Sequence, residues 1–375
     1  MNINQTNTIK NLDTEEMYLN MGPQHPSTHG VMRLGLKIEG EVILSATPDI
    51  GYLHRGMEKL AEARTYVQNV CLSDRWDYLS SALNEFAYCT TVEKLLKAQV
   101  PERADYLRVI TAELNRIASH LVLFGIYAID IGAVTPLLYA FREREIITDL
   151  MESLSGGRLL LNYFRIGGVS RDIPENFVAK TNEFLDWFEK RLPEYDDLLT
   201  NNVIFLDRTK NIGVLSAEDA INYGISGPSL RASGVKFDIR KNEAYSVYNK
   251  FDFEIPTGKN GDSWDRYYMR MLEMKESARI IRQAVNSIPE GEIITKLPKV
   301  IKPEPGEVYN RIESSRGELG IYLVSDGSQK PYRLKIRGPS FVNLMLLPQL
   351  LKGWKIADVV AILGSIDIVL GEADR

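Results

Sequence analysis

The sequence predicts an α+β fold in which a bundle of long helices forms the core and short β elements lie at both ends of the chain. Residues 107–124 repeat apolar side chains with the period of a helix, and residues 31–47 alternate as strands do. Strand-like segments return after a proline-rich stretch at 298–307. The chain of 375 residues is long enough to bury a large core.

The first residues differ from the rest of the chain. We expect residues 1–16 to form a disordered tail or a docking arm, because they are polar and acidic and lack the features of a secretion signal. Residues 17–375 are expected to form a single domain. Within it we distinguish a β hairpin and a loop over 17–55, a helical bundle over 56–290, and a C-terminal α/β segment over 291–375.

The loop at the start of the domain carries two of the four histidines. Residues Met21–Gly30 read MGPQHPSTHG, and the prolines exclude a regular helix and favour an extended backbone before each of them. His25 and His29 therefore lie on a stiffened loop, where functional groups are common. An imidazole in such a loop can equally serve only to hold the backbone together. A hairpin follows over residues 31–47.

The pattern from about Gly56 to Leu154 is almost entirely helical. The strongest helix begins at Pro101, which we assign to the first helical position. Its apolar residues follow one another at spacings of three and four: Leu107, Ile110, Leu114, Ile117, Leu121 and Phe124. Glu113, Arg116 and His120 lie off this seam.

Later elements follow from capping and turn residues. Thr135 is expected to cap a second helix that contains Pro136 and ends at Gly156. A third long helix is expected over about 263–287. Near the end of the chain we expect strands around 321–324 and 332–336 and an apolar segment at 357–366.

Composition excludes several classes of protein. The net charge of −5 gives no electrostatic footprint for nucleic acid, and we find no apolar run long enough to span a bilayer. Cys71 and Cys89 are too few for a disulfide framework or a four-cysteine metal site, so we expect no metal bound by this chain alone. Glycine-rich phosphate loops and the GxSxG motif of many hydrolases are absent.

A series of motifs points to one family. In chain order they read MGPQHPSTHGVMRL, DIGYLHRGMEKLAEARTYVQNV, DRWDYL, LNRIASHL, LYAFRERE, FRIGGV, SLRASGV, SSRGELGIYLVSDG and GEADR. Together they resemble the quinone-site large subunit of respiratory complex I, its D subunit. The resemblance covers residues 17–375 and implies a fold like that of the large subunit of nickel–iron hydrogenases.

Hydrogenases of that kind hold their metal with two pairs of cysteines, and this chain lacks them. The first pair is reduced to Cys71, and a valine and a glutamate, Val369 and Glu372, stand where thiolates would be needed near the end. Because soft metal sites need thiolate ligands, the resemblance implies a cavity without its metal.

The resemblance assigns the headgroup of the quinone to His29 and Tyr78, which would donate protons to the reduced oxygens. Asp130 would be the charged partner that orients and recharges His29. From the residues alone, Tyr78 can also be read as an aromatic core residue, and Asp130 as an exposed acid at a helix end.

Three further residues are assigned to the side that faces an iron–sulfur partner. Arg55 and Arg75 match family arginines near the partner's terminal [4Fe–4S] cluster, although each can also be read as a surface or intersubunit ion pair. Leu160 stands where many relatives carry a histidine that couples the potential of the cluster to pH. Leucine cannot take a proton, so the resemblance implies a more reducing, less pH-dependent cluster, which suits menaquinone better than ubiquinone.

The resemblance implies a component of a proton-translocating NADH:quinone oxidoreductase, inactive alone, on the cytoplasmic side of the bacterial cell membrane. Its partners would be quinone, the iron–sulfur B subunit, the C and I subunits and the membrane H subunit, with no nucleic acid. Two alternatives are the large subunit of an energy-converting hydrogenase, which the missing thiolates disfavour, and a non-catalytic scaffold protein, which would give His29 and Asp130 no purpose.

Overall fold

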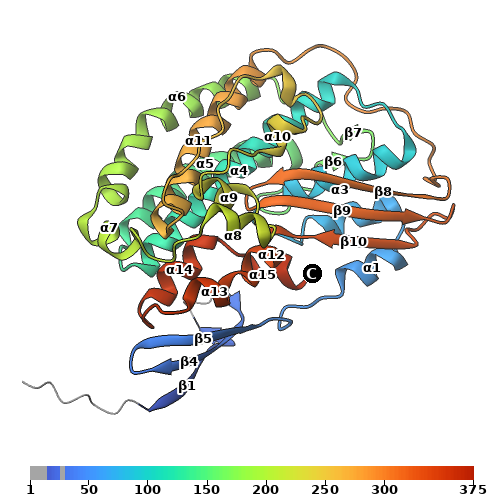
Figure 1. Cartoon of the computed structure of the whole chain (residues 1–375). Coiled ribbons are helices and arrows are strands. Elements are labelled where there is room, and N and C mark those ends of the chain that lie inside the picture. Colours follow the sequence, from blue (N-terminus) through green and yellow to red (C-terminus); the bar gives the residue numbers. More distant parts are fainter. Residues whose placement is uncertain (1–14, 26–29) are drawn as a thin grey trace, which may run out of the picture.

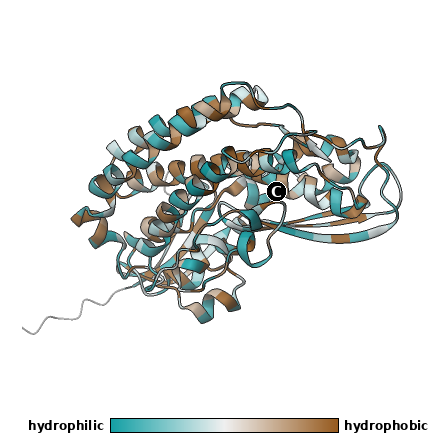
Figure 2. Cartoon of the chain, turned by 90° about the horizontal axis from the view of Figure 1, so that it is seen from above, coloured by the Kyte–Doolittle hydropathy of each residue, from teal (hydrophilic) through white to brown (hydrophobic). Residues whose placement is uncertain are grey.

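The structure is a computed structural model, and it describes residues 15–25 and 30–375. Helices and strands are mixed, and the strands form small antiparallel sheets rather than one large sheet. The α+β fold expected from the sequence is therefore confirmed. Figure 2 shows that the long helices each combine hydrophobic and hydrophilic residues.

The N-terminal sheet has three strands in the order β1-β4-β5. The expected hairpin consists of β4, Arg33–Glu39, and β5, Val42–Asp49. Strand β1, Glu16–Met21, was not predicted; it pairs antiparallel with β4. Glu16, the last residue of the expected tail, is thus the first residue of a strand, and its carboxylate pairs with Lys37 at 2.6 Å.

Long helices form the centre of the molecule (Figure 1). They are α3 (Ser81–Leu96), α4 (Glu102–Asp130), α5 (Thr135–Ser155), α6 (Phe177–Tyr195) and α11 (Ser263–Val285). The helices expected from apolar periodicity are confirmed, but two caps differ. Pro101 is the N-cap of α4 rather than its first residue, and Val134 precedes α5 where Thr135 was expected to cap it.

Helix α4 is long and apolar enough to cross a membrane by length and composition, contrary to the expectation that no segment is. Its most apolar window, however, is 89% buried inside the protein. The apolar seam packs against α5 and α11, and the off-seam residues Glu113, Arg116 and His120 are also buried. This helix is therefore wrapped by protein on nearly all sides.

Shorter elements connect the long helices. They are α1 (Met57–Ala63), α2 (Tyr66–Ser73), β6 (Phe164–Arg165), β7 (Gly168–Val169), η2 (Asp196–Thr200), α7 (Val203–Thr209), α8 (Ala217–Asn222), α9 (Gly227–Ala232), α10 (Ile239–Asn242) and η3 (Tyr248–Lys250). A second short hairpin near the N-terminus pairs β2, Gln24–His25, with β3, Gly30–Val31.

The C-terminal segment begins with a second three-stranded sheet, ordered β10-β9-β8. Strand β9 (Gly317–Ser325) contains the first expected strand, and β10 (Arg333–Arg337) matches the second with bounds one residue later. Strand β8 (Gly306–Ser314) was not predicted. Four short helices follow: α12 (Pro339–Met345), α13 (Leu347–Leu351), α14 (Asp358–Ile366) and α15 (Leu370–Asp374). They lie between the N-terminal sheet and the long helices (Figure 1).

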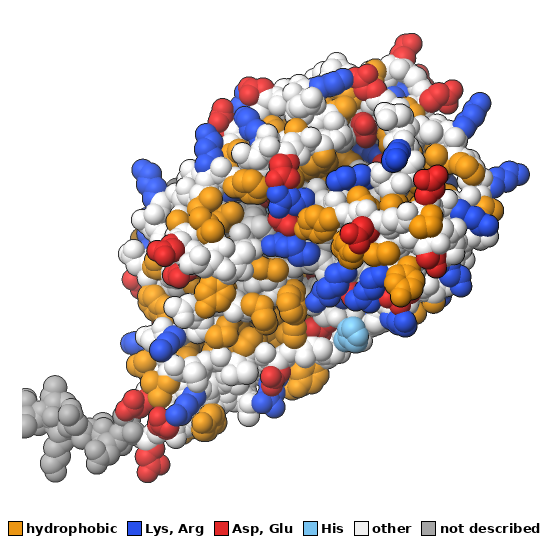
Figure 3. Space-filling model, turned by 45° about the vertical axis from the view of Figure 1, so that its right-hand side comes forward, with side chains coloured by type: hydrophobic (Ala, Val, Ile, Leu, Met, Phe, Trp, Pro, Cys, Tyr) orange, Lys and Arg blue, Asp and Glu red, His pale blue; other side chains and the backbone are white. Residues whose placement is uncertain are grey.

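The buried apolar residues form two clusters. The larger joins the long helices to the sheet β8–β10, and the smaller joins the N-terminal sheet to α12–α15. On the face in Figure 3, acidic and basic side chains are interspersed rather than separated into regions of one sign.

Candidate functional site

A cavity of about 280 Å³ lies where α4 of the larger apolar cluster meets the connection between α14 and α15. Its lining residues are Tyr78, Leu79, Val122, Leu123, Ile126, Arg316, Asp367, Ile368 and Val369. The lining is mostly aliphatic, and its polar groups are a phenol, a guanidinium and a carboxylate. Such a cavity suits a flat apolar molecule with a few polar substituents.

The segment between α2 and α3 holds Tyr78 in place through the neighbouring Asp77. The buried carboxylate of Asp77 accepts the backbone N–H of Leu79 at 3.0 Å, and its backbone carbonyl accepts the side-chain amide of Asn84 at 2.9 Å. The second carboxylate oxygen of Asp77, Oδ2, pairs with Arg316 at 2.6 Å. The bonds of Asp77 therefore fix the backbone on which Tyr78 lies.

Arg316 connects the cavity to the buried charges behind it. It lies in the turn between β8 and β9, is 0% exposed, and pairs with Asp77 and, at 3.2 Å, with Asp367. Asp367 also pairs with Arg270 at 3.4 Å. Burial alone would lower the pKa of Arg316, but the carboxylates of Asp367 and Asp77 raise it above its usual value. Arg316 therefore keeps its charge, as a buried guanidinium between two carboxylates should.

The hydroxyl of Tyr78 is a neutral donor. Burial, followed by the charge of Asp77, raises the pKa of this half-buried phenol above its ordinary value near 10.0. The ring packs against Gly371, where a Cβ would lie 2.8 Å from Cε1 of Tyr78 and 3.1 Å from Nη2 of Arg55. Only glycine permits this approach of α15 to the phenol.

The predicted site residue Arg55 lies beside Tyr78. Its guanidinium donates to the carbonyl of Gly371 at 2.8 Å, and burial lowers the pKa of Arg55. The loop before it is fastened to α15, because Asp374 accepts the backbone N–H groups of Gly51 at 2.8 Å and Leu53 at 2.7 Å. The structure thus brings Arg55, Tyr78 and the C-terminal helix together.

The predicted ligand His29 lies outside the described residues. The nearest described neighbour is Gly30, where a Cβ would lie 2.9 Å from Cδ1 of Leu370. Leu370 precedes Gly371, which contacts Tyr78, so Gly30 lies next to α15. His25 is exposed in β2.

Asp130 is the last residue of α4 and is partly buried. It is not among the residues that line the cavity, but Ile126, one helical turn earlier, is. A Cβ at Gly364 would lie 3.2 Å from Oδ2 of Asp130, which places this carboxylate against α14.

The structure does not bring Arg75 and Leu160 into the cavity. Arg75 is exposed after the end of α2, where its guanidinium donates to the carbonyl of Cys71. Leu160 is partly buried in the loop between α5 and β6.

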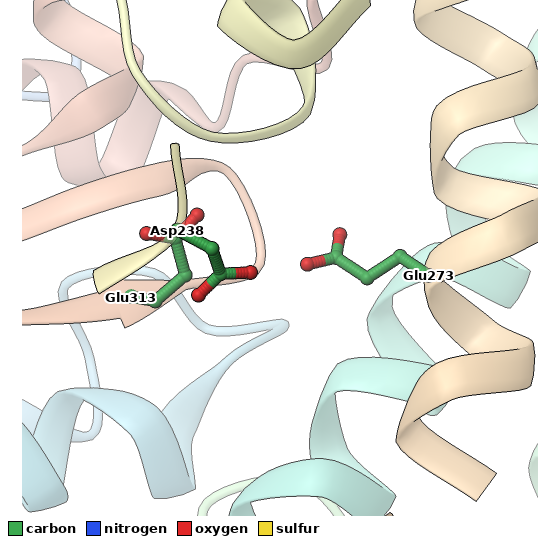
Figure 4. Close-up of side chains that lie close together, drawn as sticks. All are labelled: Asp238, Glu273 and Glu313. Carbon is green, nitrogen blue, oxygen red and sulfur yellow. The ribbon is translucent and has the colours of Figure 1, made fainter. Parts of the chain in front are cut away.

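Three buried carboxylates, Asp238, Glu273 and Glu313, point toward one another (Figure 4) and lie close enough to hold a metal ion. Guanidinium groups already occupy their oxygens. Arg231 pairs with Glu273 at 3.0 Å and with Glu313 at 2.7 Å, and Arg240 pairs with Glu273 at 2.9 Å and with Asp238 at 2.7 Å. We therefore interpret this cluster as a buried ion-pair network.

The two cysteines lie on neighbouring helices in different environments. Cys71 is exposed on α2, whereas Cys89 is buried on α3, where burial raises the pKa of its thiol well above the ordinary value. Cys89 is therefore a neutral thiol in an apolar core, which is a poor metal ligand.

Reasoning from the sequence missed Arg316, Asp367 and the buried ion-pair network. The only sign of the network in the sequence was that Glu113, Arg116 and His120 are polar residues on an otherwise apolar helix. His120 pairs with Glu273 at 2.8 Å, and burial lowers the pKa of His120, which keeps it neutral.

Comparison with known proteins agrees with this architecture. The model of the family described as respiratory-chain NADH dehydrogenase, 49 Kd subunit, matches residues 130–305 and 297–375. The chain is 57% identical to the D subunit of NADH-quinone oxidoreductase from Desulforamulus reducens over 98% of this chain and 100% of the relative. It is 56% identical to the protein of the same name from Bacillus thuringiensis over 96% of this chain and 99% of the relative. The chain belongs to the family of the 49 kDa subunit of the respiratory-chain NADH dehydrogenase, an oxidoreductase complex.

Proposed function

We propose that the Tyr78 cavity binds the headgroup of a quinone and that the chain supplies protons for its reduction within the assembled complex. The observation that carries this proposal is the cavity of about 280 Å³, with aliphatic walls and a neutral phenol among its polar groups. This volume is near the lower end for small-molecule sites, so it suits a headgroup whose tail continues outward.

Reduction of a quinone by two electrons places negative charge on two oxygens, and each oxygen must take up a proton. Tyr78 can donate to one of them, because its pKa is raised and its proton is present at neutral pH. The buried Arg316 adds a fixed positive charge to the cavity lining. Preorganised donors of this kind stabilise charge that develops during the reaction.

We assign the second donor to His29. Support comes from Gly30, the next residue, which packs against Leu370 beside the Tyr78 site. Asp130 is proposed to orient and recharge His29, because it lies one turn beyond the cavity residue Ile126 on α4. A carboxylate beside an imidazole favours its protonated form.

The electrons would come from a [4Fe–4S] cluster in the neighbouring B subunit. Arg75, exposed after α2, is proposed to face that protein, and Arg55 to lie between the cluster side and the quinone. The chain is further proposed to contact the C, I and H subunits and to lie peripherally on the cytoplasmic side of the cell membrane.

Leu160 supports menaquinone as the substrate. A partly buried leucine in the loop between α5 and β6 can neither accept a hydrogen bond nor take up a proton. A cluster facing it would stay more reducing as the pH falls, as a low-potential quinone requires.

Replacement of Tyr78 by phenylalanine tests the proposal. Tyr78→Phe keeps the ring against Gly371 and removes only the hydroxyl, so the complex should assemble. Loss of one such donor costs about 3 kcal/mol in the transition state, so quinone reduction should slow on the order of a hundredfold. Electron transfer to an artificial acceptor upstream of the quinone should be unchanged.

Tyr127→Phe is the matched control. Tyr127 is a buried tyrosine on α4 whose hydroxyl donates to the carbonyl of Ala361 at 3.0 Å, and it does not line the cavity. Its replacement should leave quinone reduction near the wild-type rate. Equal rates for the Tyr78 and Tyr127 variants would contradict the assignment of Tyr78.

A further inference from the structure

A pair of buried titratable groups lies close to the segment that carries Tyr78. Asp74 follows the last residue of α2, and Glu85 lies in the second turn of α3; both are 0% exposed. The two carboxyl groups lie close enough for a proton on one of them to be donated to the other. Neither lines the Tyr78 cavity.

Asp74 also holds the loop between α5 and β6, and Glu85 holds the first residue of β6. Oδ2 of Asp74 accepts the backbone N–H of Asn162 at 3.0 Å, and Oε2 of Glu85 accepts the backbone N–H of Phe164 at 2.6 Å. The remaining oxygens, Oδ1 of Asp74 and Oε1 of Glu85, are buried and receive no N–H or other O–H donor from the described part of the chain. A proton on one of the two carboxyl groups is therefore what joins them.

The charged groups around the pair do not replace that proton. Arg75 and Arg165 face it and favour the ionised forms, but neither donates to the pair. The guanidinium of Arg165 is bound to the carbonyls of Asn162 at 2.7 Å and Phe164 at 2.7 Å. From α3, Cys89 faces Glu85 as a neutral thiol, and the nearby Glu93 is paired with Arg108 at 2.5 Å.

Burial is the dominant influence on both groups. It raises the pKa of Asp74, and together with the neighbouring Asp74 it raises the pKa of Glu85 well above its ordinary value. Two buried carboxylates without a shared proton would repel each other and lack hydration, so ionisation of both should admit water and separate them.

We propose that Asp74 and Glu85 share one proton and act as a pH-dependent clamp on residues 160–164. When the proton leaves, the loop should loosen between its other attachments. Before the segment, these attachments include the hydrogen bond from Ser81 to the carbonyl of Leu159 at 2.9 Å and the 2.8 Å ion pair of Arg158 with Asp149 on α5. Within the segment, the carbonyl of Tyr163 accepts the backbone N–H of Ser170 at 2.9 Å. The clamp depends only on contacts within this chain. Its consequence, that the position of Leu160 beside the partner depends on one proton, rests on the proposed function.

Amide hydrogen exchange in the assembled complex tests the clamp. In the wild type, the protection of Asn162 and Phe164, corrected for the intrinsic pH dependence of exchange, should be constant at low pH. Above the pKa of the pair it should fall on the order of tenfold per pH unit. In Glu85→Gln, the amide group donates to Asp74 while its oxygen accepts from Phe164, so protection should persist at every pH.

The amides of Lys259, Asn260 and Gly261 are an internal control. All three donate to the same carboxylate oxygen, Oδ2 of Asp265. Their protection should not follow the pH dependence of Asn162 and Phe164. A fall in the protection of Asn162 that is the same in the wild type and in Glu85→Gln would overturn the proposal.

Infrared spectroscopy of the same complexes tests the shared proton itself, independently of exchange and of quinone reduction. At neutral pH, the spectrum of the wild type minus that of Asp74→Asn and the spectrum of the wild type minus that of Glu85→Gln should each contain a protonated-carboxyl band. A spectrum that neither substitution changes would also overturn the proposal. Either result leaves the Tyr78 assignment intact, so the two can fail separately.

Discussion

The carboxyl group of Glu372 should make the stability of the chain depend on pH. Glu372 lies in α15 and is 0% exposed; one oxygen accepts the backbone N–H of Ser340 at 2.9 Å, and the other is buried without a donor among the described residues. Burial, followed by the charge of Asp77, raises its pKa from 4.5 to about 7, against the opposing effect of Arg316.

The sign and size of the effect follow from the two pKa values. In the unfolded chain Glu372 loses its proton near 4.5, whereas in the folded chain it keeps the proton to about 7. The contribution of this group to stability is therefore fully present below pH 4.5 and is lost as the pH rises to about 7. Each pKa unit corresponds to about 1.4 kcal/mol, so the loss is about 3 kcal/mol.

Glu372→Gln cannot ionise and keeps an oxygen for the N–H of Ser340. Urea unfolding of the purified chain, followed by tryptophan fluorescence, should give equal stabilities for the wild type and this variant near pH 4.5. At pH 8 the variant should be more stable by about 3 kcal/mol. Glu218→Gln, the same change at an exposed position on α8, is the control for an effect of the substitution that does not depend on burial. A Glu372→Gln difference that does not change with pH would refute this reasoning.

Two further predictions concern the partner-facing loop and the start of the chain. Leu160→His should steepen the dependence of the partner cluster's potential on pH, because an imidazole takes up a proton more readily beside a reduced cluster. Redox titration by EPR at several pH values measures this slope. A steep slope already present with Leu160 would show that another group couples the potential of the cluster to pH. Deletion of residues 1–14 should leave the chain folded, because they lack apolar periodicity and precede β1. Deletion through Met21 also removes β1 and uncovers the edge of β4. Soluble expression and circular dichroism distinguish the two variants, and loss of folding on deletion of residues 1–14 alone would contradict the first expectation.

The helices were predictable where apolar periodicity decides the structure. The apolar seam of α4 predicted that this segment is a helix and predicted its bounds closely. Gly156, in a left-handed conformation, ends α5 as expected. Strand β1 was not predictable in this way, because its residues are mostly exposed and it is held by pairing with β4. Strand β8 follows a proline-rich stretch and carries the charged residue Glu313 into the buried network, which hides its strand character.

The site was less predictable than the fold. Tyr78 and Arg55 came from the resemblance to a family, and the structure brings them together at Gly371. Arg316 lies 239 positions from its partner Asp77, and a pair so distant in the sequence cannot be predicted from a local pattern. Glu85 was overlooked because an acid in a helix usually lies on the solvated face.

Labelling with a photoreactive quinone analogue tests the central claim, that the Tyr78 cavity receives a quinone headgroup. After illumination of the assembled complex, mass spectrometry should find the label on peptides that contain Tyr78, the α4 residues Val122–Ile126 or the Ile368-Val369 segment, and excess quinone should prevent it. Label confined to other parts of the chain, or label on these peptides that excess quinone does not reduce, would contradict the account.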